Sequence, residues 1–127
     1  MEQRVSALHG AGLQANAEGD YRRAYECFMA AYRLRPNGPA HILSAANMKL
    51  KVAHMAHWEA YRIAQQVAGD GKQVTSKERW HAGSTRERKA YMESWELYQE
   101  AAALPLTSKQ QTMVQEKLAE IQRAVDE

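Results

Sequence analysis

Two histidines, His54 and His57, lie three residues apart, a spacing that places both side chains on one face of a helix. Imidazole nitrogens are common zinc ligands, so this pair is the first candidate for a metal site. No nearby Asp, Glu or Cys completes a set of ligands, and we interpret the pair as two surface histidines. Glu78-x-x-His81 has the form of half a di-iron carboxylate site, but such a site needs two of these pairs and the chain holds one.

A glycine pattern, Gly10-x-Gly12-x-x-Ala15, has the spacing of a dinucleotide-binding fingerprint. That fingerprint works only after a strand and at the start of a helix, whereas here it lies inside a predicted helix with no strand before it. Cys27 lies on the helix that carries Phe28, and we interpret it as a small apolar side chain. We therefore expect no catalytic residues, no cofactor and no metal, and these patterns do not support an enzyme.

Apolar residues recur at helical spacing along the chain, and no stretch alternates apolar and polar residues as a strand would. Glycines and prolines interrupt this pattern near residues 19, 36–39, 69–71 and 105. The pattern predicts helices over 4–18, 21–35, 39–53, 55–69, 76–103 and 107–125. The spacings of Thr75 with Glu78 and of Thr107 with Gln110 predict capping boxes at the last two helix starts. The predicted fold class is all-α.

The chain has 127 residues, 45% apolar and 25% charged, with a net charge of +2, which is the balance of one globular domain. Residues 72–92 hold six basic and two acidic residues, and residues 93–127 hold three basic and seven acidic ones. Six basic residues spread over Lys72–Lys89 are too sparse to favour nucleic-acid binding. The N-terminal stretch lacks the continuous apolar block that a secretory signal requires. No segment approaches the roughly 20 apolar residues that a membrane span requires. We expect a cytoplasmic protein that binds no membrane.

The segment from residue 5 to residue 38 carries more information than helical spacing alone. Small residues at Gly12 and Ala24 permit two helices to approach closely, and Phe28 fills the space between them. Gly19 allows the sharp turn between the two helices. The full pattern is Leu8, Ala11, Gly12, Ala15, Ala24, Phe28 and Pro36. This pattern resembles the tetratricopeptide repeat, a helix–turn–helix unit of about 34 residues.

The resemblance implies antiparallel helical hairpins stacked as a short solenoid, a single domain over residues 1–127. Its units would cover about 5–38, 39–72 and 75–105, with a C-terminal capping helix over 107–125 that covers the last apolar face. In the second unit, the first helix would run from Ala40 to Val52, and Ala60 and Ala64 would belong to the second helix.

A second family shares part of this pattern. The Y-x₂-A-x₃-F-x₂-A spacing that begins at Tyr21 also resembles the microtubule-interacting and trafficking domain, a three-helix module that binds the tails of membrane-remodelling polymers. The stretch from Tyr91 to Val125 resembles it as well. That module is about half as long as this chain, so the chain would hold more than one.

The tetratricopeptide resemblance implies a non-enzymatic adaptor or scaffold whose concave groove binds a peptide or helix of another protein. The first helix of each hairpin would line this groove. The implied partner-binding residues are His9, Leu13, Asn16, Leu43, Asn47, Leu50, Lys51, Arg79 and Arg86. Leucines mixed with Asn, Lys and Arg favour a ligand with apolar anchors and acidic flanks. Three alternatives stay open: a structural or self-associating helical subunit of a larger complex, a helical domain like the microtubule-interacting and trafficking domain, and a weak nucleic-acid adaptor.

Overall fold

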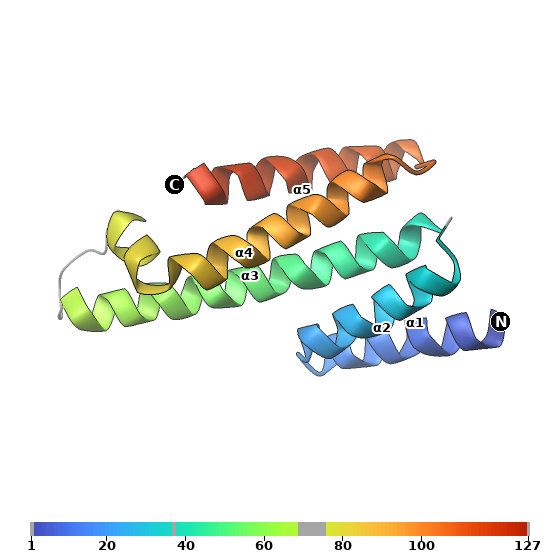
Figure 1. Ribbon diagram of the computed structural model, residues 1–127, viewed down its shortest axis with the longest axis horizontal. Helices are drawn as coiled ribbons and strands as arrows, with labels where there is room; N and C mark the ends of the chain where they lie inside the picture. The colour runs from blue at the N-terminus through green and yellow to red at the C-terminus, as the bar shows by residue number, and fades with distance from the viewer. Residues whose placement is uncertain (1, 37, 69–75, 127) are drawn as a thin grey trace.

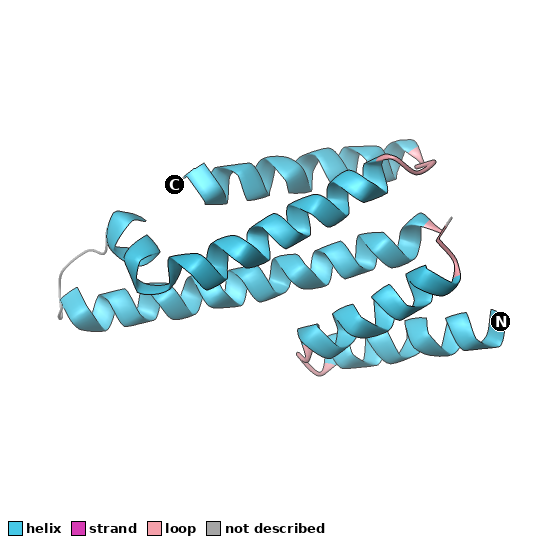
Figure 2. Ribbon diagram, in the orientation of Figure 1, coloured by secondary structure: helices cyan, strands magenta, loops and turns pink. Residues whose placement is uncertain are grey.

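The computed structural model describes the backbone of residues 2–36, 38–68 and 76–126, with all of their side chains except those of residues 2, 60, 64, 67, 68 and 76–86. Five helices make up this structure: α1 (Glu2–Ala17), α2 (Tyr21–Leu34), α3 (Pro39–Ala68), α4 (Ser76–Ala102) and α5 (Ser108–Asp126). The described residues form helices and short loops and no strand (Figure 2). The all-α prediction is confirmed.

The helices pack in chain order, each against the next (Figure 1). Helices α1 and α2 form an antiparallel hairpin that lies against the N-terminal half of α3. Helix α4 runs back along α3, and α5 covers the pair that α3 and α4 form. The C-terminal half of α3 extends beyond the turn between α1 and α2, so the hairpin does not cover it.

The predicted break between helices at 39–53 and 55–69 does not exist, because α3 continues through His54 as one helix of 30 residues. No Gly or Pro occurs between residues 40 and 68, so nothing in this stretch stops helix propagation. Residues 39–68 therefore do not fold back on themselves as a hairpin, and α3 pairs with α4 instead. Helix α4 is continuous from Ser76 to Ala102, in agreement with the helix predicted over 76–103, so these residues do not contain the turn of a third hairpin.

Local chemistry explains the helix ends that the sequence predicted. Gly19 has a φ of 81°, a conformation open to glycine, and it reverses the chain after α1. The side chain of Asp20 caps α2 by accepting a hydrogen bond from the Arg23 N–H at 3.2 Å. At the start of α5, Thr107 and Gln110 exchange two hydrogen bonds of 2.9 and 3.1 Å, which confirms that capping box. The capping box predicted at Thr75 lies outside the described residues.

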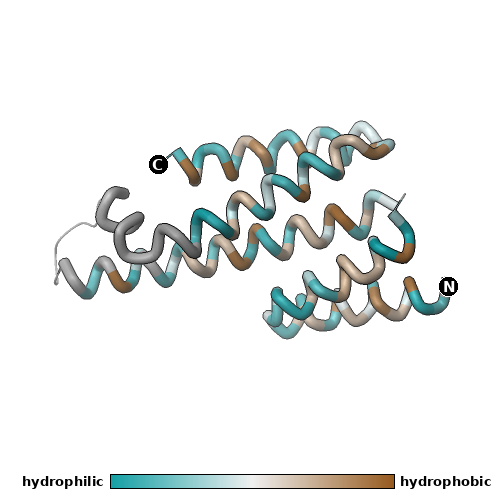
Figure 3. The backbone as a smooth tube through the Cα atoms, in the orientation of Figure 1, coloured by the Kyte–Doolittle hydropathy of each residue, from teal (hydrophilic) through white to brown (hydrophobic). Residues whose placement is uncertain are grey.

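Two apolar clusters hold the helices together, and apolar residues recur along each helix to supply them (Figure 3). The larger cluster joins α3, α4 and α5 and contains Ile42, Leu50, Tyr91, Tyr98 and Ile121, among others. The smaller cluster joins the α1–α2 hairpin to α3 and consists of Ala15, Ala24, Phe28, Ala45 and Met48. Tyr25 and Met29 of α2 pack against both clusters, so the hairpin and the three-helix part share one continuous interior.

Close contact between α1 and α2 depends on the absence of a side chain at Gly12. A Cβ atom added there would lie 2.6 Å from Phe28 Cε1, well inside van der Waals contact. The Phe28 ring is almost completely buried and has no room to move away. Gly10, two residues earlier on the same helix, has nothing within 4 Å of an added Cβ.

Gly12→Ala and Gly10→Ala are therefore expected to change stability in opposite directions. Gly12→Ala overpacks the Phe28 site and should destabilise the protein by about 1–3 kcal/mol. Gly10→Ala removes backbone freedom from an exposed helix position and should stabilise the protein by about 1 kcal/mol. Phe28→Ala should cost roughly 3–5 kcal/mol. Urea unfolding of the three variants measures these differences, and equal stabilities for the two alanine variants would contradict the packing described.

Candidate functional site

The predicted groove residues of α1 lie beside α3, and only one of them is freely exposed. The His9 ring packs 5.1 Å from the Phe28 ring, and its Nδ1 lies 3.2 Å from Nδ1 of His41 on α3. Asn16 accepts a hydrogen bond of 2.8 Å from Lys51 Nζ, which ties the end of α1 to the middle of α3. Leu13 is 53% exposed. Two of these three residues therefore position α1 on α3.

The predicted groove residues of α3 divide between the core and the surface. Leu43 is 7% exposed and Leu50 is 2% exposed, and both pack in the cluster that joins α3 to α4 and α5. This is a correction: their side chains are interior and do not line a groove. Asn47 and Lys51 are half-buried at the surface. The prediction placed too many α3 residues on the surface because it did not foresee helices packed on several sides of α3.

The last two predicted residues, Arg79 and Arg86, belong to α4, but their side chains lie outside the described residues. The structure therefore brings together His9, Asn16 and Lys51 on neighbouring faces of α1 and α3. The seven predicted residues whose side chains are described do not form one groove, because Leu43 and Leu50 are buried.

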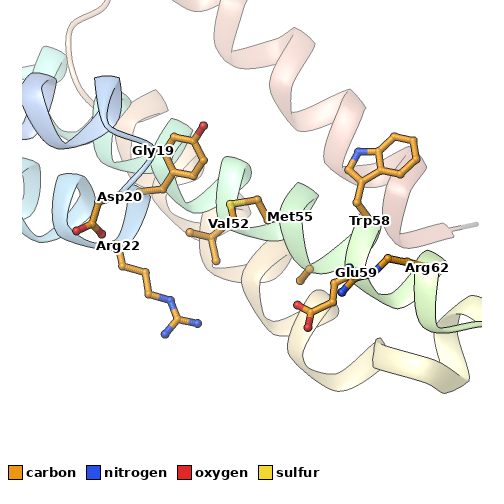
Figure 4. A pocket seen from close by; sticks show the side chains of 10 residues that line it. Gly19, Asp20, Arg22, Val52, Met55, Trp58, Glu59 and Arg62 are labelled. Atoms are coloured by element: carbon orange, nitrogen blue, oxygen red, sulfur yellow. The ribbon is translucent and has the colours of Figure 1, made fainter.

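A hollow of about 720 Å³ lies between the middle of α3 and the turn that joins α1 to α2 (Figure 4). We name it the α3 notch. Its lining residues come from the α1–α2 turn with the start of α2, and from the middle of α3: Gly19, Asp20, Tyr21, Arg22, Val52, Met55, Ala56, Trp58, Glu59 and Arg62. Within the described residues, a smaller pocket of about 330 Å³ between α2 and α4 shares Arg22 and Val52 with the notch.

Large apolar side chains in the α3 notch are unusually exposed. Trp58 is 66% exposed and Met55 is 56% exposed, although both belong to residue types that normally lose most of their surface on folding. The Trp58 ring meets the rings of His57 and Tyr61 edge to face, at centroid distances of 5.8 and 6.1 Å. These contacts hold the indole in a defined position while leaving most of it open to water.

Charged side chains of both signs surround this apolar surface. Arg22 lies at the hairpin side of the notch and Arg62 at its far end along α3, and no ion pair among the described residues involves either. The Nζ atom of Lys51 lies 5.1 Å from the centre of the Tyr21 ring, which is at the edge of the notch. Of the two carboxylates in the lining, Asp20 is engaged as the α2 cap, and Glu59 lies one turn before Arg62.

The histidine pair singled out in the sequence belongs to a separate polar cluster between α3, α4 and α5. His57 Nδ1 lies 2.8 Å from Oε1 of Glu87, a carboxylate that is completely buried. Nδ1 of His54 lies 3.0 Å from the Tyr91 hydroxyl, and Nε2 of the same histidine lies 3.4 Å from Oε1 of Glu120. The two histidines are therefore only partly exposed, and each has partners on other helices that their spacing in the sequence did not indicate.

This polar cluster is suited to holding helices in register. A buried carboxylate is stable only with a close hydrogen-bonding or charged partner, so Glu87 fixes the position of α4 relative to His57 on α3. Within the described residues, no three His, Cys, Asp or Glu side chains come close enough to hold a metal ion. Neither the α3 notch nor the pocket between α2 and α4 is lined by His54, His57 or Glu87.

None of the described helices combines the length and the apolar character that crossing a bilayer requires. In comparisons with models of known protein families, with curated proteins and with solved structures, no match to this chain was found.

The sequence analysis missed Met55, Trp58 and Arg62 as site residues. A signal for them was present: from Val52 onward, the spacing 52, 55, 59 and 62 continues one face of a helix that no Gly or Pro interrupts. Exposure of that face could not be foreseen, because it depends on where the α1–α2 hairpin ends relative to α3.

Two histidines make the stability of the fold depend on pH. The pKa of His41 is lowered by burial, with His9 and Arg35 adding to the effect. Burial also lowers the pKa of His54, more than Glu120 raises it, and His57 and Lys117 lower it further. Because both pKa values lie below the unfolded value, the unfolded state binds more protons as the pH falls through about 6.5.

Stability is therefore expected to decrease between about pH 7.5 and about pH 5.5, and His41→Gln with His54→Gln should reduce that decrease. Thermal unfolding of both proteins across this range measures the effect, since titration of the carboxylates is common to both and cancels in the difference. An equal or steeper loss of stability in the double variant would contradict the assignment.

Proposed function

We propose that the chain is a non-enzymatic protein–protein interaction module of the adaptor or scaffold kind, and that the α3 notch binds a peptide or helix of another protein. The observation that carries this proposal is the exposure of Trp58 and Met55 at the edge of a hollow. Exposed aromatic and apolar side chains grouped beside a hollow and rimmed by charges are typical of interaction sites.

The energetics favour use of this surface in binding. Covering the exposed part of a tryptophan side chain stabilises a complex by about 3–4 kcal/mol. The edge-to-face contacts of Trp58 with His57 and Tyr61 restrict its ring before any partner arrives, so less side-chain entropy is lost on binding. Met55 adds a flexible side chain that can adapt to different apolar partners.

We further propose a tetratricopeptide-like stacking for the helices, with two hairpins in place of three. Helices α1 and α2 are the first hairpin, over residues 5–38, and α3 with α4 is a second hairpin of unusually long helices. Helix α5 then takes the place of the capping helix expected over 107–125. The support for this order is the consecutive antiparallel packing and the contact between Gly12 and Phe28 in the first hairpin.

Site-specific crosslinking tests where a partner binds. A photoreactive phenylalanine derivative is placed at Tyr61, which borders Trp58, and in separate proteins at Leu13 and Met92, which are exposed on α1 and α4. Irradiation in native extract should give a discrete adduct from position 61 and not from position 92. Trp58→Ser in the position-61 protein should reduce the adduct at least about tenfold, because it removes the apolar anchor.

Adducts from position 13 without adducts from position 61 would place binding on the exposed face of α1 and overturn the assignment to the notch. Equal labelling at all three positions would show unspecific contact and would contradict the proposed function.

A further inference from the structure

The α3 notch is long enough to hold a short helix of a partner. From Val52 to Arg62 the axis of α3 advances by about 15 Å, which is the length of roughly three helical turns. The turn between α1 and α2 closes one end of this space, and the rest of its floor is the surface of α3 (Figure 4). A helix placed there would lie along α3 beyond the end of the hairpin.

The floor and the rim of the notch differ in chemistry. Val52, Met55 and Ala56 form an apolar floor, with the exposed Trp58 indole beside it. Such a surface matches the apolar face of an amphipathic helix, whose anchoring residues recur every three or four positions. A partner segment in extended conformation would present its apolar side chains to alternating sides and would cover this floor less well.

The rim determines the charge that a partner should carry. Arg22 and Lys51 lie near the hairpin end, and Arg62 lies at the opposite end. None of these three cations takes part in an ion pair with another described residue. The Asp20 side chain caps α2. Asp20 and Glu59 offset two of the three positive charges, because a carboxylate keeps its charge while it caps a helix. With Lys51 included, the rim carries one net positive charge, and its cations at both ends are complementary to acidic side chains on either side of an apolar helix face.

We propose that the α3 notch binds an amphipathic helix of another protein, about three turns long, with an apolar face flanked by Asp or Glu. This inference rests on the proposed function and adds the chemistry of the partner to it. A second copy of the chain is a poorer occupant, because pairing two notches would bring two net positive rims together. A duplex nucleic acid would satisfy the cations but not the exposed Trp58 and Met55.

Selection from a displayed library of helices tests this proposal. Each member has about four turns and an apolar face of Leu, Ile, Met or Phe, and each flanking position encodes Glu, Lys or Gln with equal frequency. Sequencing after selection on the intact 127-residue protein should show Glu enriched over Lys at the flanking positions by at least about tenfold. Affinity of the selected helices should fall as salt rises.

Charge reversal at the rim provides the matched comparison. Arg22→Glu and Arg62→Glu should each weaken binding of a selected acidic helix at least about tenfold. Arg123→Glu makes the same change on the exposed surface of α5 and should leave the affinity unaltered. Circular dichroism checks that all three variants remain folded.

The outcomes separate this inference from the proposed function. Selected helices that depend on Trp58 but show no preference for Glu, or bind equally well after both Arg reversals, overturn the acidic-helix inference and leave the interaction module standing. Failure to select any helix that depends on Trp58 overturns both. A concentration-dependent dimer in light scattering that Trp58→Ser abolishes makes the occupant a second copy and overturns the inference.

Discussion

The structure depends on a mismatch in helix length. Helix α3 has 30 residues, whereas α1 and α2, which pack against one side of it, have 16 and 14. At 1.5 Å per residue, α3 is about 45 Å long and the hairpin covers only about half of it. The uncovered half carries Met55 and Trp58, both of which are exposed. The notch and its exposed aromatic surface follow directly from this difference.

The hairpin can define one wall of the notch only because its own position is fixed. Gly12 allows the Phe28 ring to lie against α1, and the same ring packs with Ala45 and Met48 of α3. The hydrogen bond from Lys51 to Asn16 fixes the end of α1 close to the notch. On other faces of α3, the larger apolar cluster and the pairing of His57 with Glu87 hold α4 and α5 in register. The site is thus built on rigid elements.

Local features of the fold could be predicted from the sequence because local chemistry determines them. The turn at Gly19, the capping box at Thr107 and the close packing of Gly12 with Phe28 each involve residues whose types leave few alternatives. The break expected near residue 54 was wrong because the repeat resemblance was extended over a stretch that lacks any helix-breaking residue. Leu43 and Leu50 were assigned to a groove for the same reason, since their faces depend on which helices pack on α3. The partners of His54 and His57 come from α4 and α5, at sequence distances that no spacing rule reaches.

The continuity of α3 is the central claim, and a distance between spin labels at Ala40 and Ile63 tests it most directly. Both positions are exposed, and Cys27 is replaced by Ala so that only the two introduced cysteines react. A continuous helix separates residues 40 and 63 by about 35 Å, and the account predicts one narrow distribution near that value. Helices in a hairpin pack about 8–10 Å apart, so a main distance below about 20 Å would show that the chain folds back near residue 54 and would contradict the account.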